Sequence, residues 1–378
     1  MVSSTTVIVD MANPEILITK IGLEAVCLPL AKPLRTSIHE IRQVYCLLAT
    51  IETNLGITGE GYAFCFGESQ LRAIAQMTTS ISARFVQRDP HDIEAIWSEV
   101  FRANNFYGQA GVAILAMNPL DVACWDLIGK AADRPLYKLF GACRDRVPVY
   151  ASGGLWLSSN VAELEQEAKA FVSAGFKAMK LRLGSKRWQD DVGRVAAVRN
   201  AIGADVRLMV DVNQGLGASD ALHLGRALDT FELAWFEEPV PTWNDDASAA
   251  IASRLDTPVA SGETEYTRYG IRRMVERKGA DIYMPDLQRM GGYTEMRKVI
   301  HFLAAHDLPV APHIFTEHSL HLVASASNAI WCEHMPWFEP MFKERMVVEA
   351  DGMVALPNRA GVGFTFDWDA IEHYRIAL

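Results

Sequence analysis

The chain has 378 residues, 50% of them hydrophobic, which is enough for one large barrel and a smaller domain. Its formal net charge of −10 argues against nucleic acid or an anionic membrane as a partner, because such surfaces repel an acidic protein. No stretch of about 18 apolar residues lacks charges, so no membrane span is predicted.

The start of the chain and the cysteines indicate the compartment. Residues 1–14 carry no leading Lys or Arg, unlike a signal peptide, and are expected to form a loose tail. The 6 cysteines are scattered and form no CxxC pair, so we expect reduced thiols packed in the core. Reduced thiols are typical of the cytoplasm, where we therefore expect the protein.

Residues 15–64 are expected to form an antiparallel meander, because three strand-like stretches are separated by polar residues and a turn signal. The expected strands are Glu15–Ile21, Val44–Ile51 and Thr58–Ala63. The polar stretch Ala31–Arg42 lies between the first two. We expect it to be a loop that folds over a barrel mouth as a lid.

From residue 69 to about residue 130 the apolar residues follow helical spacing. Helices are expected over Ile93–Phe101 and Gly111–Gly129. Strands followed by helices predict an N-terminal α+β domain over residues 1–140. A C-terminal segment, about 350–378, is expected to pack back on this domain and complete it.

In the second half of the chain, short apolar runs end one after another in a polar or charged residue. These terminal residues are Arg182, Asp211, Glu237, Glu263, Asp286, His313 and Glu333. They lie 20 to 29 residues apart, and one strand with its crossover helix and loops needs roughly 20–30 residues. With a first strand expected at Val147–Gly154, the pattern predicts a (β/α)8 TIM barrel over residues 141–349, in the α/β class.

The strand ends of such a barrel converge on one mouth, so their charges predict a site. Asp211, Glu237 and Glu263 are carboxylates on three successive strand ends, and three anions share a small volume only when a cation neutralises them. Oxygen ligands suit Mg²⁺, whereas Zn²⁺ is less expected without an HxH or HExxH motif. Three carboxylates that are hydrogen-bonded independently remain an alternative.

Asp286 and His313 end the next two strands. A carboxylate beside a histidine fixes its tautomer and raises its basicity, which is typical of a general base near neutral pH. Lys180 and Arg182 lie two residues apart on one strand, so both side chains point to the same face. They are either two cations opposite the histidine or a solvated basic strand end.

At this point the sequence resembles the enolase superfamily, in the mandelate racemase subgroup (the mandelate racemase/muconate lactonizing enzyme family). The resemblance rests on Asp121–Asp126, Lys180–Arg182, Asp211–Asn213, Glu237–Pro239, Gly262–Glu263, Asp286, Pro312–His313 and Glu333. It implies a modified (β/α)8 barrel of (β/α)7β type that carries the active site, with an N-terminal α+β capping domain. It also implies an even-numbered homo-oligomer, a dimer, tetramer or octamer.

The resemblance further implies roles for the strand-end residues. One Mg²⁺ is held by Asp211, Glu237 and Glu263, and a His313–Asp286 dyad is the base. The last strand end, Glu333, is implied to donate a hydrogen bond to the substrate carboxylate, which Lys180 also meets.

Arg182 departs from the racemase pattern, which is Lys-x-Lys with the second Lys as a base opposite the histidine. A guanidinium has a pKa above about 12 and rarely serves as a base. With one confident base, His313, the chemistry that fits is removal of the proton next to a carboxylate, an enediolate stabilised by Mg²⁺, and loss of a β-hydroxyl. Arg182 is expected to be an electrostatic partner, or an unusual base if its pKa is strongly depressed.

The expected function is therefore Mg²⁺-dependent dehydration of an aldonic or aldaric acid sugar, galactarate/talarate-like, to a 2-keto-3-deoxy acid by a hydro-lyase. A racemase, epimerase or cycloisomerase acting on a carboxylate is one alternative, and a non-catalytic binding relative is another. The residues expected to contact the substrate are Asn213, His39, Arg35, His318 and Trp156.

Overall fold

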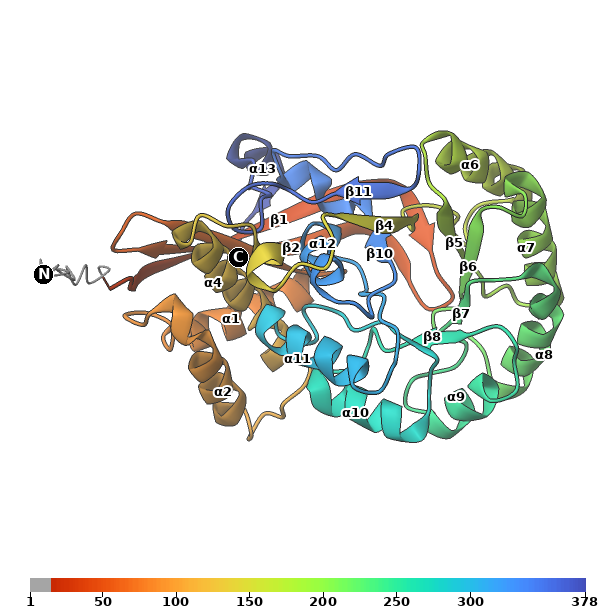
Figure 1. Ribbon diagram of the computed structural model, residues 1–378, viewed down its shortest axis with the longest axis horizontal. Helices are drawn as coiled ribbons and strands as arrows, with labels where there is room; N and C mark the ends of the chain where they lie inside the picture. Colours follow the sequence, from red (N-terminus) through yellow and green to blue (C-terminus); the bar gives the residue numbers. More distant parts are fainter. Residues whose placement is uncertain (1–14) are drawn as a thin grey trace, which may run out of the picture.

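The structure is a computed structural model that describes residues 15–378. The loose tail expected for residues 1–14 lies outside the described residues. Figure 1 shows two parts side by side: an N-terminal sheet with its helices on the left, and a ring of strands and helices on the right. The C-terminal segment, in blue, returns to the N-terminal sheet. The expected fold class, a barrel-type domain with an α+β capping domain, is confirmed.

The N-terminal sheet is antiparallel, with strand order β12-β1-β2-β3. Its strands are β1 (Ile18–Arg35), β2 (Glu40–Thr53), β3 (Thr58–Cys65) and the C-terminal β12 (Arg375–Ile376). The expected meander is confirmed, but the expected loop over Ala31–Arg42 is wrong. Leu34 pairs with Ile41 and Arg35 with Glu40, so most of this stretch is a long hairpin and only residues 36–39 form its turn. The two halves of the stretch pair with each other through backbone hydrogen bonds, and this pairing stabilises strands despite their polar side chains.

Helices pack on one face of this sheet. They are α1 (Glu68–Ser82), the 3₁₀ turn η1 (Pro90–Asp92), α2 (Ile93–Ala103), α3 (Val112–Leu115), α4 (Asn118–Ala131) and α5 (Leu136–Leu139). The single helix expected over Gly111–Gly129 is interrupted between α3 and α4, where Pro119 occupies the first turn of α4 and cannot donate a backbone hydrogen bond. By length and composition the stretch Val112–Ala131 could cross a membrane. However, 83% of its most apolar run of 18 residues is buried inside the structure, as in the core helix of a globular domain.

The barrel consists of parallel strands in the order β10-β4-β5-β6-β7-β8-β9. They are β4 (Arg146–Ala151), β5 (Ala178–Arg182), β6 (Arg207–Asp211), β7 (Trp235–Glu237), β8 (Val259–Ser261), β9 (Ile282–Tyr283) and β10 (Cys332–His334). Isolated parallel bridges of Val310 to Tyr283 and to Ala329 join the ends of the ring. Its carboxyl-terminal edge therefore collects the strand ends named above.

Helices follow the barrel strands. Most of them form the outer layer in Figure 1, whereas the last is almost entirely buried. They are α6 (Val161–Ser173), α7 (Trp188–Ile202), α8 (Ala218–Leu228), α9 (Asp245–Ala252), α10 (Thr267–Arg277), α11 (Tyr293–Ala304) and α12 (Thr316–Ser325), with a short 3₁₀ turn η2 (Asp229–Phe231) after α8. Their buried faces pack on the strands, and the capping domain faces the carboxyl-terminal strand ends across a cavity.

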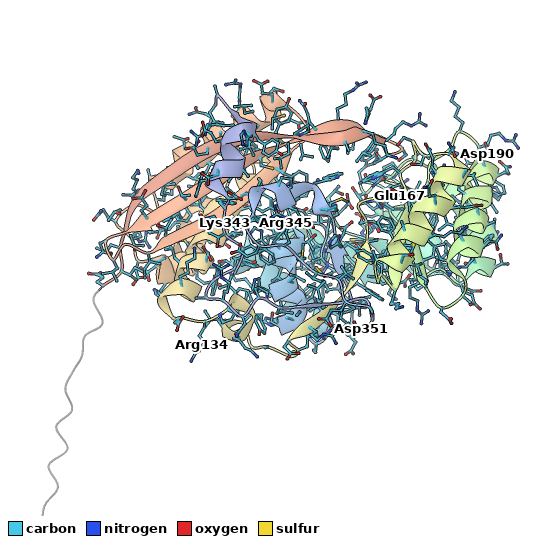
Figure 2. All side chains as sticks on the ribbon, turned by 90° about the horizontal axis from the view of Figure 1, so that it is seen from above. Arg134, Glu167, Asp190, Lys343, Arg345 and Asp351 are labelled. Atoms are coloured by element: carbon cyan, nitrogen blue, oxygen red, sulfur yellow. The ribbon has the colours of Figure 1, made fainter. Side chains whose placement is uncertain are left out.

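The C-terminal segment ties the two parts together. It contains η3 (Pro336–Met341), β11 (Met353–Ala355), which is antiparallel to β4, and α13 (Trp368–Tyr374) before β12. Buried Asp126 on α4 accepts hydrogen bonds from the amides of Val362, at 2.8 Å, and Glu60, at 3.0 Å. Figure 2 shows α13 lying beside the N-terminal strands, and β12 after it pairs with β1.

Candidate active site

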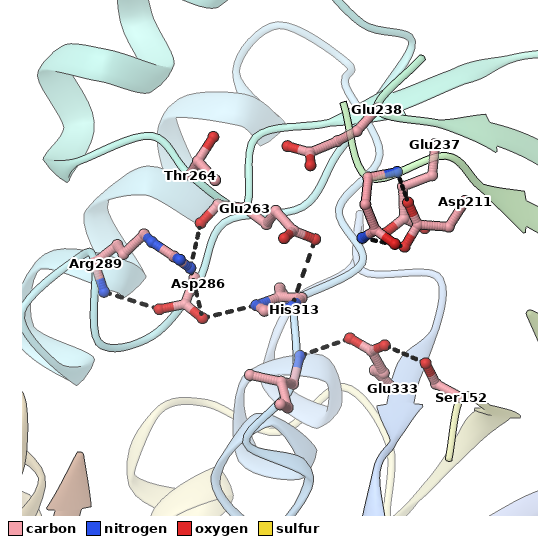
Figure 3. A network of polar contacts seen from close by, with 12 residues as sticks. Ser152, Asp211, Glu237, Glu238, Glu263, Thr264, Asp286, Arg289, His313 and Glu333 are labelled. Atoms are coloured by element: carbon pink, nitrogen blue, oxygen red, sulfur yellow. Dashed lines mark hydrogen bonds and ion pairs between the residues drawn. The ribbon is translucent and has the colours of Figure 1, made fainter. Parts of the chain in front are cut away.

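Three carboxylates gather where β6, β7 and β8 end. Asp211 and Glu237 are the last residues of their strands, and Glu263 follows β8 after Gly262, whose φ of 122° lets the chain turn. One ligand oxygen of each lies within 4.8 Å of the others. Figure 3 shows Asp211 and Glu237 side by side, with Glu263 facing them.

Neighbouring residues hold two of these carboxylates in place. Asn213 donates its backbone amide and its Nδ2 to Asp211, at 2.8 and 3.0 Å. The buried indole of Trp235 donates Nε1 to Oε2 of Glu237, at 2.8 Å. Such contacts fix the orientation of ligating groups before a metal binds.

The charge of the triad fits a hard divalent cation. Burial, followed by the nearby carboxylate of Asp211, raises the pKa of Glu237 to about 8. The three side chains therefore repel one another as anions, and a bound cation relieves that repulsion. The donor atoms are all oxygens, which suits Mg²⁺.

Lys180 lies beneath the triad and does not line the cavity at the mouth. Its Nζ is 2.7 Å from Glu237, 3.1 Å from Glu333 and 3.6 Å from Asp211, and its side chain is 1% exposed. Burial alone lowers the pKa of Lys180, but these carboxylates outweigh burial and raise it above the usual value. Lys180 is therefore held as a cation.

Arg182 does line the cavity, and its guanidinium is held on several sides. Its Nη2 donates to Ser152 at 2.9 Å, its Nε is 3.5 Å from Asp211, and its plane lies over Trp156. Burial alone lowers the pKa of Arg182, but the carboxylate of Asp211 and then that of Glu333 raise it above its usual value. This direction is opposite to the depressed pKa that a base at Arg182 would need.

His313 and Asp286 form the expected dyad. Nδ1 of His313 is 2.7 Å from Oδ2 of Asp286, and Nε2 lies 3.5 Å from Glu263, toward the triad. Arg289 braces the dyad, with its amide at 2.9 Å from Asp286 and its Nη1 donating to the carbonyl of Glu263 at 2.9 Å. Burial lowers the pKa of His313, but the carboxylates of Glu263 and Asp286 outweigh it and raise the pKa to about 9.

Glu333 is hydrogen-bonded through both of its carboxylate oxygens. Its Oε1 accepts from Ser152 at 2.5 Å, and its Oε2 accepts from the amide of Ile314 at 2.7 Å. Burial raises the pKa of Glu333, but the cations Lys180 and His313 outweigh it and hold it well below the usual range. An ionised carboxylate accepts hydrogen bonds, as both oxygens do in the described structure, and the expected role as a donor to the substrate carboxylate stays a prediction.

A cavity of about 520 Å³ opens at this mouth. Asn213, His39 and Trp156 line it, as the expectation of substrate contacts requires. Arg35 lines a neighbouring groove beside the hairpin turn instead. His318 is 2% exposed and packs against Tyr62, because it points into the interior from the first turn of α12, so the structure does not bring it to the cavity.

Several cavity residues were not singled out by the sequence. Glu238 is buried beside the triad, and its Oε2 accepts from Gln214 at 2.9 Å. Burial, followed by the carboxylate of Glu263, raises its pKa well above the usual value. Arg289 was also missed, although its position three residues after Asp286 is the spacing at which an arginine can return to a carboxylate.

Comparison with known proteins agrees with this site. Residues 19–141 match the family model described as mandelate racemase / muconate lactonizing enzyme, N-terminal domain, and residues 163–370 match the one described as enolase C-terminal domain-like. The chain belongs to the mandelate racemase / muconate lactonizing enzyme family. The resemblance seen in the sequence, to this family within the enolase superfamily, is thereby confirmed.

Named members of the family include dehydratases. The chain is 31% identical over 356 residues to L-talarate/galactarate dehydratase of Salmonella typhimurium, which covers 93% of this chain and 89% of the relative. It is 32% identical over 359 residues to 3,6-anhydro-alpha-L-galactonate cycloisomerase of Streptomyces coelicolor, covering 94% and 98%. The expected enzyme class, a hydro-lyase, agrees with the first of these names, and other members of the family carry out isomerisations.

A solved structure of the family contains the expected metal. L-talarate dehydratase from Polaromonas sp. JS666, complexed with Mg and L-glucarate, superposes with a TM-score of 0.89 at 31% identity and covers 96% of this chain and 98% of that one. The expected Mg²⁺ cofactor is thus confirmed for the family. In this chain, the triad of Asp211, Glu237 and Glu263 offers the donor set that such an ion needs.

Proposed function

We propose that this protein is a Mg²⁺-dependent dehydratase that converts an aldonic or aldaric acid sugar to a 2-keto-3-deoxy acid. The observation that carries the proposal is an asymmetric pair of side chains in one cavity. His313 is paired with Asp286 near the carboxylate triad, and it becomes a proton acceptor when a metal ion neutralises Glu263, the carboxylate that raises its pKa most. On the other side, Arg182 lines the same cavity and is held as a cation. One acceptor suits an elimination, whereas racemisation by two bases needs one on each face.

In the proposed dehydration, the carboxylate triad and His313 have separate roles. A Mg²⁺ held by Asp211, Glu237 and Glu263 would supply positive charge for the substrate carboxylate and for the negative charge that develops beside it. Nε2 of His313 removes the α-proton, because Nδ1 is occupied by Asp286. The imidazolium then returns that proton to the β-hydroxyl as it leaves.

The step is balanced without a further reagent. The α-C–H and β-C–O bonds break, one water leaves with the transferred proton, and the resulting enol rearranges to the 2-keto-3-deoxy acid. A histidine that takes and then returns one proton ends the cycle in its starting state. The same group therefore serves as base and acid.

Unpaired polar atoms in the cavity support a hydroxyl-rich substrate. Nε and Nη1 of Arg182, Nε1 of Trp156, Oδ1 of Asn213 and Oε1 of Glu238 are buried without a hydrogen-bond partner in the described structure. All four residues line the cavity. Buried polar atoms are costly when unpaired, and a polyhydroxy acid offers both donors and acceptors to satisfy them.

The test is a screen of acid sugars with the purified Mg²⁺-loaded protein, in which 2-keto acids are detected with semicarbazide. We expect at least one aldonate or aldarate to give a 2-keto-3-deoxy acid. If no acid sugar gives product while another carboxylate exchanges its α-proton with deuterium, the dehydratase proposal is wrong.

Cycloisomerisation is a second candidate, because one relative at 32% identity is named for it. Cycloisomerisation uses the same proton transfer, because a base removes a proton next to the carboxylate or an acid returns a proton to that carbon. A non-catalytic binding protein is disfavoured by the intact triad and dyad, because a buried cluster of carboxylates is costly to keep without a use. A cycloisomerase would show a ring-opened or ring-closed isomer by NMR without release of water, and this outcome distinguishes it from the first candidate.

We also propose a homo-oligomer with an even number of subunits. Phe106, Tyr107 and Trp243 are 90%, 74% and 83% exposed, and large apolar side chains at this exposure favour a subunit contact. Light scattering during size exclusion should give twice, four or eight times the mass of one chain, and a monomer would refute the proposal.

All six cysteines are free thiols, which supports a reducing compartment such as the cytoplasm.

A further inference from the structure

One side of the cavity is aromatic. Phe64, Phe66, Trp156 and Trp337, which we call the aromatic wall, all line it. The guanidinium of Arg182 lies 4.8 Å from the centre of the Trp156 ring, and Trp156 stacks on Trp337 with centroids 5.7 Å apart and planes at 13°. The wall therefore begins at the guanidinium beside the triad.

The wall continues from there to the capping domain. Trp337 meets Phe66 edge-on at 6.1 Å, and Phe66 meets Phe64 at 5.8 Å. Phe64 lies on β3 and Phe66 directly after it, so this end of the wall belongs to the N-terminal sheet. The wall joins the reacting end of the cavity to the side that the capping domain covers.

The capping domain adds further apolar side chains to this side of the cavity. They are Ile38, Ile41, Ile74, Val112 and Leu115, from the hairpin, α1 and α3. Thr36 and Gln70 add uncharged polar groups on this side, whereas the carboxylates and arginines of the lining all come from the barrel. The cavity thus has a polar end for the reacting carbons and an apolar side for the rest of the ligand.

The basic side chains of the cavity are already paired with other groups of the protein or placed for catalysis. Among the described residues that line it, those with a basic side chain are Arg182, Arg289, His313 and His39. Arg182 contacts Ser152 and Asp211. Arg289 contacts Asp286 and the carbonyl of Glu263, and His313 is the base.

His39, at the hairpin turn, does not change this conclusion. Its ring packs against Phe66, with centroids 5.6 Å apart. Burial lowers the pKa of His39, so the ring is neutral at neutral pH. The apolar side of the cavity therefore offers no cation to a second carboxylate.

We propose that this cavity selects monocarboxylic acid sugars, the aldonates, over the dicarboxylic aldarates. The proposal rests on the dehydratase function proposed above and names its substrate class. A carboxylate at the far end of an aldarate would lose water against an apolar surface without a cation, which is costly. A neutral terminal CH₂OH group, with C–H bonds facing the rings of the aromatic wall, has no such cost.

The first test compares matched pairs of acids that share the configuration of every carbinol carbon and differ only at the terminal carbon, such as galactonate and galactarate or gluconate and glucarate. In any pair that reacts, we expect kcat/KM for the aldonate to be at least tenfold higher. An aldarate that reacts as well as its aldonate partner would overturn the proposal while leaving the dehydratase function intact.

Binding provides a reading that does not depend on turnover. With Mg²⁺ present, calorimetry on His313→Asn should give at least tenfold tighter binding of the aldonate in each pair. If no acid sugar reacts with the wild-type protein but this preference is found, the dehydratase proposal fails and the selectivity stands as a property of the cavity. Equal or weaker binding of the aldonates overturns the selectivity.

A gain of cationic charge tests the cause. Ile38 lies at the turn of the β1–β2 hairpin, lines the cavity and is 52% exposed, so an arginine is tolerated there. Ile38→Arg should shift the ratio of aldarate to aldonate kcat/KM, or of their affinities, toward the aldarate by at least fivefold.

The matched control is Leu55→Arg, at the turn between β2 and β3. Leu55 is 43% exposed and does not line the cavity. It adds the same charge to the same sheet, and the ratio should stay within twofold of the wild type. Equal shifts in both variants, or none in Ile38→Arg, would show that missing positive charge at the apolar side is not what selects the substrate.

Discussion

Trp235 offers a sharp test of how the metal site is held. Its indole is fully buried, and Nε1 donates a hydrogen bond to Oε2 of Glu237 at 2.8 Å. Trp235→Phe removes this donor and leaves most of the packing volume in place. We expect the variant to fold and to bind Mg²⁺ more weakly.

The magnitude follows from the type of contact. A hydrogen bond to a charged group contributes about 1.5–3 kcal/mol, and a tenfold change in affinity corresponds to about 1.4 kcal/mol. The loss in Mg²⁺ affinity is therefore expected to be about 10- to 100-fold, which is the usual range for groups that orient metal ligands. Burial and the nearby Asp211 already raise the pKa of Glu237, so losing a donor makes its ionised form harder to maintain.

The assay is calorimetric titration of the metal-free protein with Mg²⁺ at fixed pH, without substrate. The matched control is Trp97→Phe, because Trp97 is equally buried and donates Nε1 to the carbonyl of Gly291 at 3.2 Å, away from the triad. The control should keep its Mg²⁺ affinity within twofold. Affinity within twofold of the wild type in Trp235→Phe would refute the argument that this hydrogen bond prepares Glu237 for the metal.

Three further outcomes are expected. His313→Asn should lower kcat by about 10²- to 10⁴-fold and leave Mg²⁺ affinity nearly unchanged by calorimetry, since a general base typically contributes this factor; turnover near wild type would place the base elsewhere. Burial raises the pKa of Asp121 to about 7, so the folded state binds more protons than the unfolded state between about pH 4 and 7, and stability falls as pH rises through that window. In urea unfolding at pH 5 and 7.5, Asp121→Asn should lose less stability between the two pH values than the wild type, and an identical loss would contradict the assignment. Asp126→Ala should lower the free energy of unfolding by about 3–5 kcal/mol, because it leaves Lys130 and the amides of Glu60 and Val362 without their buried acceptor; a loss below 1 kcal/mol in urea unfolding, roughly that of an exposed pair, would show that the contacts are dispensable.

The barrel and the gathering of its three carboxylates could be predicted because their signal is local. Asp211 and Glu237 each end an apolar run, and the run sets the strand while the strand end sets the mouth. The spacing of such runs also reports the crossover helices between them. One strand, its crossover helix and the loops between them together span fewer than about 30 consecutive residues, so each strand end can be located from a short stretch of sequence.

The missed features depend on distant partners. The hairpin over Ala31–Arg42 forms because the two edges pair with each other, and composition alone does not show this. The contacts of Glu333 with Ser152 and Lys180 likewise join residues that lie far apart in the chain. His318 was misplaced because a histidine soon after a strand end can face either the cavity or the core, and the aromatic ring of Tyr62 decides for the core.

The turn of the β1–β2 hairpin is bonded to the barrel beside the site. At its tip, Ser37 donates hydrogen bonds to the carbonyls of Val212 and, at 3.0 Å, Asn213 on the barrel. Farther back, the register of the two strands shifts between Pro29 and Leu34, where regular pairing is interrupted. Ser37 therefore holds the hairpin turn against the residues that directly follow Asp211, so the N-terminal sheet sets the width of the cavity at this edge.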